Sequence, residues 1–488
     1  LAPPSGRARA GAAGGRRPVQ PVLLVLESFF QFACDCWTGG SAEVLAGLGH
    51  RLYPPIARAL VQHFDTCGAD GGEALERFET FARDLGLVKS AEKTLSRHVH
   101  QHRHAVGEQR RANILAEARE WLLQEDTSLE DVADDSEPGS ITKLLENRFG
   151  EVAQSQQVPE IADAAVSDRL RHALKADAGL LRLPAMRVSR AAHRIAAKLR
   201  ALMEEAVEAA GQGRAEVAGE LSKLVREVCT LFAILRPYAQ KALLKSNARC
   251  CGIFLTDCLY LVHVLILMPY SFGKRLPEEH RPLSFFVDLV PQLRRLGENH
   301  FFAMLQHQQQ QLIATLQRLD LGPGISQDRA FIAAEAALGA ASQQVKEIAQ
   351  GLSVSLPTEL LREVSGVLVG VVCQNMLGKL FGLRYLAPEE VGCVTALFTS
   401  ALAMYRQVFP AVAAPDDAGL EHDVPGWAVL SLAADLLGSG FSRFLEKREE
   451  LIRVCKREEA LKLMELSWRD EGISPEDAWA SWAGSGGD

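Results

Sequence analysis

The chain of 488 residues is long enough for several packed units, because single hydrophobic cores stop growing well before that size. Apolar residues make up 48% and charged residues 23% of the chain, which excludes wholesale disorder. The formal net charge of −8 is spread along the chain, so there is no basic face of the kind that neutralises phosphates, and we expect no direct nucleic-acid partner.

The ten cysteines show neither the paired CxxC spacing of a zinc site nor a small disulfide framework. We interpret them as reduced thiols, which predicts a cytoplasmic protein. Cys229, Cys258 and Cys373 lie inside apolar helical patterns, where a free cysteine behaves as a small buried hydrophobe.

Residues 1–21 are rich in Ala, Gly, Pro and Arg without hydrophobic periodicity, and we expect them to be disordered. The apolar run that follows is too short for a targeting segment, and we interpret the start at Leu1 as that of a fragment or an imperfect gene model. Residues 22–124 then form a predicted helical middle segment.

The string HVHQHRH at 98–104 places His98 and His102 on one helical face, and His100 and His104 on another. Two histidines one turn apart could hold a metal, as in a metal-dependent helical-bundle enzyme. The string lacks the Glu of HExxH and any acidic or cysteine ligand at suitable spacing, so we favour a solvated helical face. Metal analysis of the purified protein separates these hypotheses.

An acidic stretch, EDTSLEDVADDSEPG, follows the middle segment. Charge repulsion and its closing Pro-Gly pair predict a linker, which we extend over residues 125–183.

Residues 184–322 are predicted to form a helical bundle. Apolar positions recur at steps of three and four, as is typical of paired long helices. These positions are 188, 192, 195, 199, 202 and 206, and then 217, 221, 224, 228, 231 and 235. Pro237 is expected to end or kink the second helix.

The apolar stretch 250–270 carries Asp257 and His263 and ends at Pro269, so it has too few clean residues for a membrane span. We interpret it as a buried core helix with His263 as a hydrogen-bonded core residue. A fourth helix is expected from Phe285, bent at Pro291.

Residues 323–470 are predicted to form a C-terminal helical bundle. Pro357 and Pro388 mark the first turns of two of its helices, and a long polar helix over about 430–467 closes it.

Residues 471–488 form an acidic tail in which Trp479 and Trp482 lie one turn apart. Exposed tryptophans among acids resemble a linear docking motif, and the open alternative is a tail folded back on the last helix. With Trp427 and Trp468, they are our candidate partner-binding residues.

No block of alternating β-branched or aromatic residues is bounded by turn signals, so we predict an all-α fold of elongated helical bundles or a rod. Phosphate-binding loops, nucleophile elbows and zinc-protease motifs are also missing from the sequence. We therefore expect a non-catalytic protein without cofactor or metal, which works by holding other proteins.

The strings TDCLYLVHVLI at 256–266 and FFVDLVPQLRRLGENHFFAMLQ at 285–306 resemble the C-terminal half of the zeste-white-ten family of kinetochore and tethering proteins. Weaker echoes follow the same order at 183–195, 351–372, 405–409 and 424–427. The most specific element is FVDLVPxLRRLG, whose residues we interpret as structural. They are Phe286, Val287, Asp288, Leu289, Val290, Pro291, Arg294, Arg295 and Gly297. We expect Asp288 to cap the turn before Pro291 or to pair with Arg294 and Arg295.

The resemblance implies a helical rod of the multisubunit tethering (CATCHR-like) class without catalytic residues. One assembly of that family, with Rod and Zwilch, supports the spindle checkpoint and dynein recruitment at kinetochores. The other, with the neuroblastoma-amplified (NAG) subunit and SNAREs, captures coatomer-coated vesicles on their way from the Golgi to the endoplasmic reticulum. The resemblance implies docking on Rod or its tether counterpart, and peripheral association with the endoplasmic reticulum and kinetochores through partners.

The family's N-terminal coiled-coil region, which pairs with a second tether subunit, has no counterpart in this sequence. The tryptophan tail could replace the family's acidic, tryptophan-containing coat-binding loops. A subunit of another helical tether, such as exocyst or the conserved Golgi tether, remains the alternative within the same class.

Overall fold

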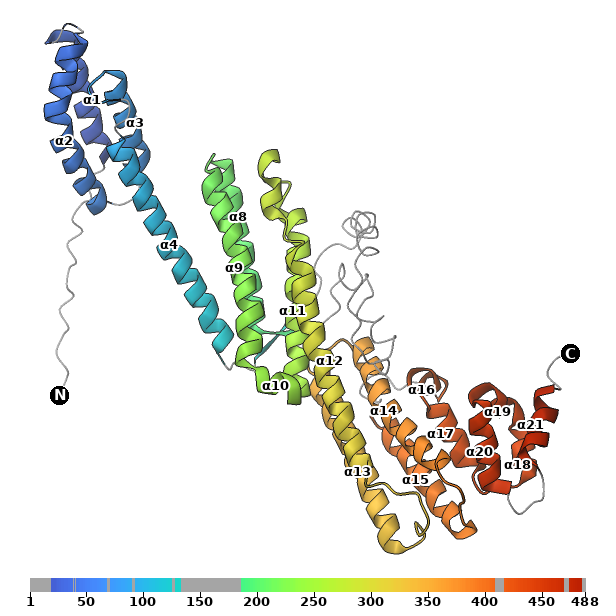
Figure 1. The fold of residues 1–488 in the computed structure, drawn as a ribbon. Coiled ribbons are helices and arrows are strands. Elements are labelled where there is room, and N and C mark those ends of the chain that lie inside the picture. The colour runs from blue at the N-terminus through green and yellow to red at the C-terminus, as the bar shows by residue number, and fades with distance from the viewer. Residues whose placement is uncertain are drawn as a thin grey trace, which may run out of the picture. The chain divides into compact units, whose positions relative to one another are not determined.

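The computed structural model describes residues 19–37, 39, 41–67, 71–89, 93–124, 128–132, 186–408, 417–468 and 474–484. Residues 1–18 of the segment expected to be disordered, and residues 133–185 of the acidic linker, lie outside these ranges. The expectation of disorder is wrong for residues 19–21, which begin the first helix, Val19–Cys36. The chain divides into two compact units, Leu1–Glu117 and Ala118–Asp488, and each is described by itself (Figure 1).

The described part of the first unit is helical. Its helices are α1 (Val19–Cys36), α2 (Ala42–Cys67), α3 (Gly72–Asp84) and α4 (Thr94–Leu123), the last of which belongs to this unit as far as Glu117. Apolar side chains from all of them form one core, in which Phe30, Phe64 and Phe78 are almost fully enclosed. The amphipathic pattern of each helix is therefore satisfied inside this unit.

A buried carboxylate, Glu79 on α3, ties these helices together. Its Oε1 accepts hydrogen bonds from the Tyr53 hydroxyl at 3.0 Å and the Leu95 N–H at 2.9 Å, and its Oε2 accepts from the Ser96 N–H at 2.9 Å. Leu95 and Ser96 lie in the first turn of α4, where backbone donors have no partner within the helix. Burial raises the pKa of Glu79, but the hydrogen bonds outweigh it and hold that pKa below its ordinary value.

Two short strands open the second unit. Strand β1 (Leu129–Val132) pairs antiparallel with β2 (Met186–Ser189), with Leu129 opposite Ser189. The prediction that the chain contains no sheet is wrong at this point. Four residues within an acidic stretch are too few to show a period of two, and the pairing depends on β2, which packs on the long helix α11.

The next helices pack in pairs. They are α8 (Arg190–Gly211), α9 (Ala215–Ala239), α10 (Lys241–Ser246), α11 (Ala248–Phe272), the 3₁₀ helix η2 (Glu278–Ser284) and α12 (Leu289–Leu316). Helix α8 packs with α9, and α11 packs with α12. Helices α8 and α9 form a hairpin, green in Figure 1, that turns at Gly213 with φ +74°. The predicted pairing of two long helices is confirmed, and every predicted apolar position of α8 is buried. On α9 the predicted stripe is wrong in part, because Val217 is 41% exposed and Leu231 and Leu235 are only half-buried.

Helix α11 lies at the centre of the second unit, where it packs against α8, α12 and α13 (Asp328–Ser353). Helices α11 and α14 (Thr358–Phe381) are both long and apolar enough, by composition, to cross a membrane. Of their most apolar windows, 78% and 67% are buried inside the protein. Apolar side chains on all sides of a helix are typical of such enclosure. The prediction of a buried core helix over 250–270 is confirmed, and His263 is buried as expected.

Prolines mark helix starts in this unit. Pro388 is the first residue of α15 and Pro357 directly precedes α14, so both predicted starts are confirmed. The bend expected at Pro291 is wrong. Because α12 begins at Leu289, Pro291 lies in its first turn, where a missing N–H donor breaks no hydrogen bond.

The C-terminal part consists of shorter helices stacked beside α14. Preceding them are α13 (Asp328–Ser353), α14 (Thr358–Phe381) and α15 (Pro388–Arg406). The short helices are α16 (Asp417–Asp423), α17 (Trp427–Leu436), α18 (Phe441–Glu446), α19 (Arg448–Val454), α20 (Arg457–Trp468) and α21 (Pro475–Gly484). The predicted long polar helix over 430–467 is wrong. Gly438, with φ +74°, ends α17, and further breaks at Lys447 and Cys455 let the pieces fold back on one another.

The cysteine side chains that the structure describes are free thiols. Cys229, Cys258 and Cys373 are at most 1% exposed. Burial raises the pKa of Cys229 and of Cys373 to about 12, so these thiols stay protonated and unreactive.

Candidate partner-binding surface

A single arginine of α9 holds the FVDLVP string against the bundle. The Arg226 guanidinium donates to Asp288 Oδ2 at 2.5 Å and to the Phe285 carbonyl oxygen at 2.8 Å, and lies 5.2 Å from the centroid of the Phe286 ring. The expectation for Asp288 is therefore wrong, because its side chain points back to α9 and makes no helix cap. Arg294 instead donates to Glu298 at 2.8 Å.

The residues of this string divide into inward and outward groups. Phe286 and Leu289 are buried, and a Cβ atom added at Gly297 would lie 2.9 Å from Cβ of Cys258, so α12 and α11 can approach this closely only with glycine at that position. Val290, Pro291 and Arg294 are half-buried, whereas Val287 and Arg295 are exposed. The string thus joins α9, α11 and α12, while Val287 remains 40% exposed.

The string TDCLYLVHVLI also holds a junction between elements. The buried Asp257 carboxylate accepts from the N–H and the hydroxyl of Ser189, each at 2.7 Å, and the Ser189 hydroxyl accepts from Ala192 N–H at the start of α8. Thr256 donates to the Arg187 carbonyl oxygen at 2.9 Å. Burial raises the pKa of Asp257 to about 6, although Arg236 and the Ser189 hydrogen bonds oppose the shift.

Comparison with known proteins assigns this region. Residues 181–314 match the family described as centromere/kinetochore protein zw10, C-terminal.

The chain carries a zw10 C-terminal domain. Two curated relatives, both centromere/kinetochore protein zw10 homologues, agree with this assignment. The Rattus norvegicus protein is 26% identical over 46% of this chain and 29% of its own length. The Mus musculus protein is 22% identical over 69% of this chain and 43% of its own length. The chain thus spans less than half the length of these relatives, and the predicted resemblance is confirmed.

The zw10 domain exposes apolar side chains on α9 and α10. Ile234 is 64% exposed and Tyr238, one helical turn further, is 79% exposed, and Leu243 on α10 is 49% exposed. Our sequence-based search missed these residues. No signal in the sequence marks them, because Tyr238 continues the steps of the predicted stripe at 228, 231 and 235, which we assigned to the inside of the bundle.

Beyond the zw10 domain, two glycines of α14 receive the turn that holds VPGW. A Cβ atom added at Gly370 would lie 2.8 Å from Cδ of Pro425, and one at Gly366 would collide with the Asp423 carbonyl oxygen. Gly426, with φ +83°, makes the turn itself. The two segments that resemble the family at 351–372 and 424–427 therefore pack directly against each other.

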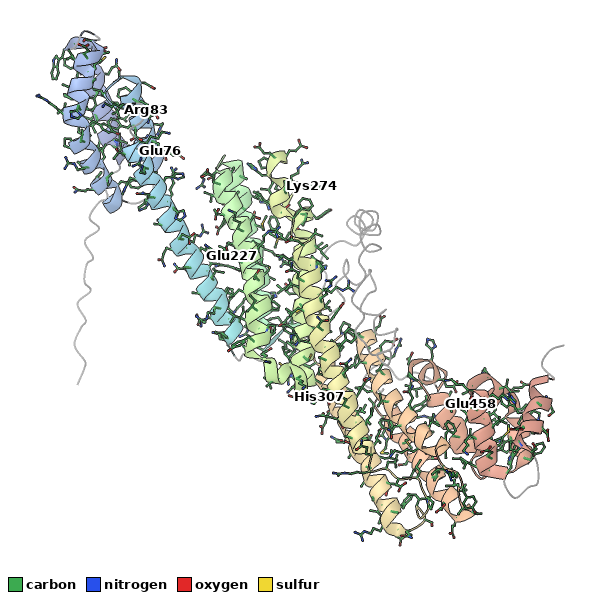
Figure 2. All side chains as sticks on the ribbon, in the orientation of Figure 1. Glu76, Arg83, Glu227, Lys274, His307 and Glu458 are labelled. Carbon is green, nitrogen blue, oxygen red and sulfur yellow. The ribbon has the colours of Figure 1, made fainter. Side chains whose placement is uncertain are left out.

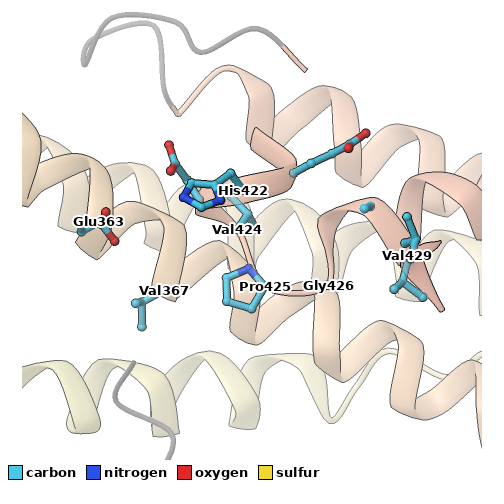
Figure 3. Close-up of a pocket in the computed structure, with 11 residues that line it drawn as sticks. Glu363, Val367, His422, Val424, Pro425, Gly426 and Val429 are labelled. Carbon is cyan, nitrogen blue, oxygen red and sulfur yellow. The ribbon is translucent and has the colours of Figure 1, made fainter. Parts of the chain in front are cut away.

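A pocket of about 460 Å³ lies beside this turn (Figure 3). Its lining mixes acidic and aliphatic side chains with one histidine. The labelled residues around it are Glu363, Val367, His422, Val424, Pro425, Gly426 and Val429. One acid of the lining, Asp423, pairs with Arg362 at 3.3 Å. We assign no reaction to this arrangement.

The candidate tryptophans are largely buried. Trp427 and Trp468 are each 1% exposed and Trp482 is 6% exposed, while Trp479 is half-buried. The Trp468 ring meets Trp482 edge-to-face at 6.0 Å and Phe444 at 4.7 Å. The expectation of exposed tail tryptophans is thus wrong for Trp482. Helix α21 folds back on α20, which is the alternative that the sequence left open.

The histidine cluster splits into two pairs on α4. The rings of His98 and His102 lie edge-on to Phe64, with centroids 6.1 and 5.0 Å away, so the predicted solvated face is wrong for this pair. His100 and His104 are exposed as predicted. Within the ranges that the structure describes, no three His, Cys, Asp or Glu side chains gather as a metal site.

Proposed function

We propose that the chain is a non-catalytic scaffold subunit that binds a large helical partner through its zw10 domain. The observation that carries the proposal is the match of residues 181–314 to the zw10 C-terminal family. The relatives are named for the centromere and kinetochore, which supports a mitotic role with Rod-like and Zwilch-like partners. Tethering of Golgi-derived vesicles at the endoplasmic reticulum, with NAG-like subunits, SNAREs and coatomer, is the second role that we propose for the same scaffold.

The exposed side chains of α9 supply a contact for such a partner. Isolated apolar residues are normal on a protein surface, but an aromatic and an aliphatic side chain one turn apart, each more than 60% exposed, form the kind of anchor that dominates interface energies. A helical partner could cover Ile234 and Tyr238 with one apolar face. We therefore place the partner contact on this part of α9.

Affinity purification followed by mass spectrometry tests the function. Recovery of Rod-like and Zwilch-like chains would support the kinetochore role, and recovery of SNAREs, coatomer and NAG-like subunits would support tethering. Imaging of the tagged chain should find it in the cytoplasm, at the endoplasmic reticulum or, in mitosis, at kinetochores. Recovery of exocyst-type or Golgi-tether subunits alone would contradict both roles.

A matched pair of variants tests the surface. Ile234→Asp is expected to reduce partner recovery about tenfold or more, because a charge replaces an interface anchor. Ile332 on α13 is the control, since it is 62% exposed, close to the 64% of Ile234, and lies outside residues 181–314. Equal recovery with Ile234→Asp and Ile332→Asp would contradict the placement on α9, although the scaffold function itself would stand.

A further inference from the structure

Helix α1 of the first unit has two apolar faces, and only one of them is buried. Leu23, Phe30 and Ala33 are at most 2% exposed in the core. A second row lies about 100° further around the helix, since each residue advances the helix by that angle. This row, which we call the α1 seam, consists of Val22, Val25, Phe29 and Phe32, with exposed fractions of 42%, 69%, 41% and 52%.

The α1 seam has the spacing of a helix-to-helix contact. Its residues follow steps of three, four and three, the repeat with which two helices pack along one stripe. Trp37 extends the seam at the end of the helix, where its ring meets Phe29 and Phe32 edge-to-face, each at 5.9 Å. A contiguous exposed row of this kind marks an interaction surface, since water-facing apolar patches are costly.

We propose that the α1 seam is the contact between two copies of this chain, with the two α1 helices antiparallel. The order Val, Val, Phe, Phe along the seam indicates both that the partner is a second copy and that the two helices are antiparallel. An antiparallel pair centred at residue 27 sets Val22 opposite Phe32 and Val25 opposite Phe29 of the second copy. Each of the four layers then combines one small and one large side chain, which gives even packing.

A parallel pair would instead face Phe with Phe and Val with Val, so its layers would differ in volume along the seam. Both directions are two-fold symmetric and would give a closed dimer without an exposed seam for further copies, so the even packing of the layers carries the choice of direction. The seam is thus complementary to itself only in the antiparallel direction.

The charges of α1 are compatible with such a pair. Glu27 and Asp35 are its only charged residues. Glu27 lies on the side of the helix away from the seam, and Asp35 would face the opposite end of the second copy's helix, near residue 19. The two carboxylates of α1 therefore do not face each other across the contact.

The contact has the size at which weak, transient interfaces are found. One pair of 18-residue helices offers less than about 1,200 Å² of total buried surface, at the low end of specific interfaces. We therefore expect a reversible dimer with a dissociation constant on the order of micromolar.

Sedimentation of the native chain over a range of concentrations tests the proposal. We expect a dimer that dissociates on dilution, and Val25→Asp should raise the dissociation constant at least tenfold. The matched control is Val106→Asp, because Val106 on α4 of the same unit is 51% exposed and lies outside the seam. Circular dichroism and a melting curve establish that both variants fold.

A swap tests the direction. Val25→Phe should weaken the dimer by placing Phe opposite Phe29, and the double change with Phe29→Val should restore it. A native chain that stays monomeric up to about 100 µM, well above a micromolar constant, would overturn the proposal. Equal dimerisation of the folded Val25→Asp and Val106→Asp variants would overturn it as well.

Discussion

Two buried carboxylates show how local donors set protonation in this protein. Glu79 accepts two backbone N–H groups at a helix start and a tyrosine hydroxyl, and its pKa is lowered. Asp257 also accepts two hydrogen bonds, yet burial raises its pKa to about 6. The donors around Asp257 are too few to outweigh its complete burial. As pH rises, Glu79 should therefore add to the stability of the fold, whereas Asp257 should reduce it.

The first prediction concerns Asp257. Its pKa is about 6 in the fold and 3.8 ordinarily, so between these values the unfolded chain loses a proton that the fold keeps. The contribution of this group to stability is therefore largest below pH 3.8, falls as pH rises to about 6, and is constant above that. Asp257→Asn cannot ionise and should lack this component. Between pH 4 and 7 the melting temperature of the native chain should fall relative to that of the variant as pH rises. A difference in melting temperature that does not depend on pH would contradict a raised pKa of Asp257.

The second prediction concerns Glu79. Glu79 accepts a fourth hydrogen bond from the Ser96 hydroxyl. Glu79→Gln cannot accept all four hydrogen bonds and leaves a donor in the first turn of α4 without a partner, which should cost the first unit about 1–3 kcal/mol. Glu76→Gln is the control on the same helix, labelled in Figure 2, because Glu76 forms an exposed pair with Arg103 at 3.1 Å. Such pairs contribute at most about 1 kcal/mol. Chemical denaturation measures both variants, and equal losses would contradict the capping role.

At the scale of elements, glycines of α14 let another segment approach. The turn around Pro425 fits only because Gly366 and Gly370 have no side chains, whereas Gly378 on the same helix has nothing within 4 Å of an added Cβ. Helix propensity alone favours alanine at each position. At Gly366 and Gly370 close packing requires glycine although helix propensity favours alanine. At Gly378 nothing opposes alanine.

The third prediction uses this contrast. Gly366→Ala and Gly370→Ala should each lower the melting temperature, because the added methyl group displaces the turn and costs about 1–3 kcal/mol. Gly378→Ala should leave stability unchanged or raise it by up to about 1 kcal/mol. If the melting temperature changed in the same direction in all three variants, close approach of the turn to α14 would not be the reason for glycine at positions 366 and 370.

The elements that could be predicted from the sequence are those with long periodic patterns. Helices α8 and α9 show a stripe over many turns, and the buried helix α11 is apolar on every side. The strand pair was missed because four residues carry no period and the pairing depends on contacts with α11. The closing helix was predicted too long because the chain is redirected at Gly438, Lys447 and Cys455, and no glycine or proline marks the last two breaks in the sequence.

At the scale of the whole chain, the family could be recognised from the sequence because its strings are fixed by packing. Asp257 and Gly297 hold one element against another, and few residue types would fit there. The binding surface could not be predicted in the same way. Exposed residues such as Ile234 and Tyr238 satisfy no constraint inside the fold, so only their exposure in the structure reveals them. Three of the candidate tryptophans, Trp427, Trp468 and Trp482, are instead buried, because their large side chains pack in the core.

Hydrogen–deuterium exchange of the native chain, alone and with the helical partner that co-purifies with it, tests the scaffold role most directly. The account predicts slower exchange on partner addition over the second half of α9 and α10, which hold Ile234, Tyr238 and Leu243. Unchanged exchange throughout residues 186–314 in the presence of bound partner would contradict it.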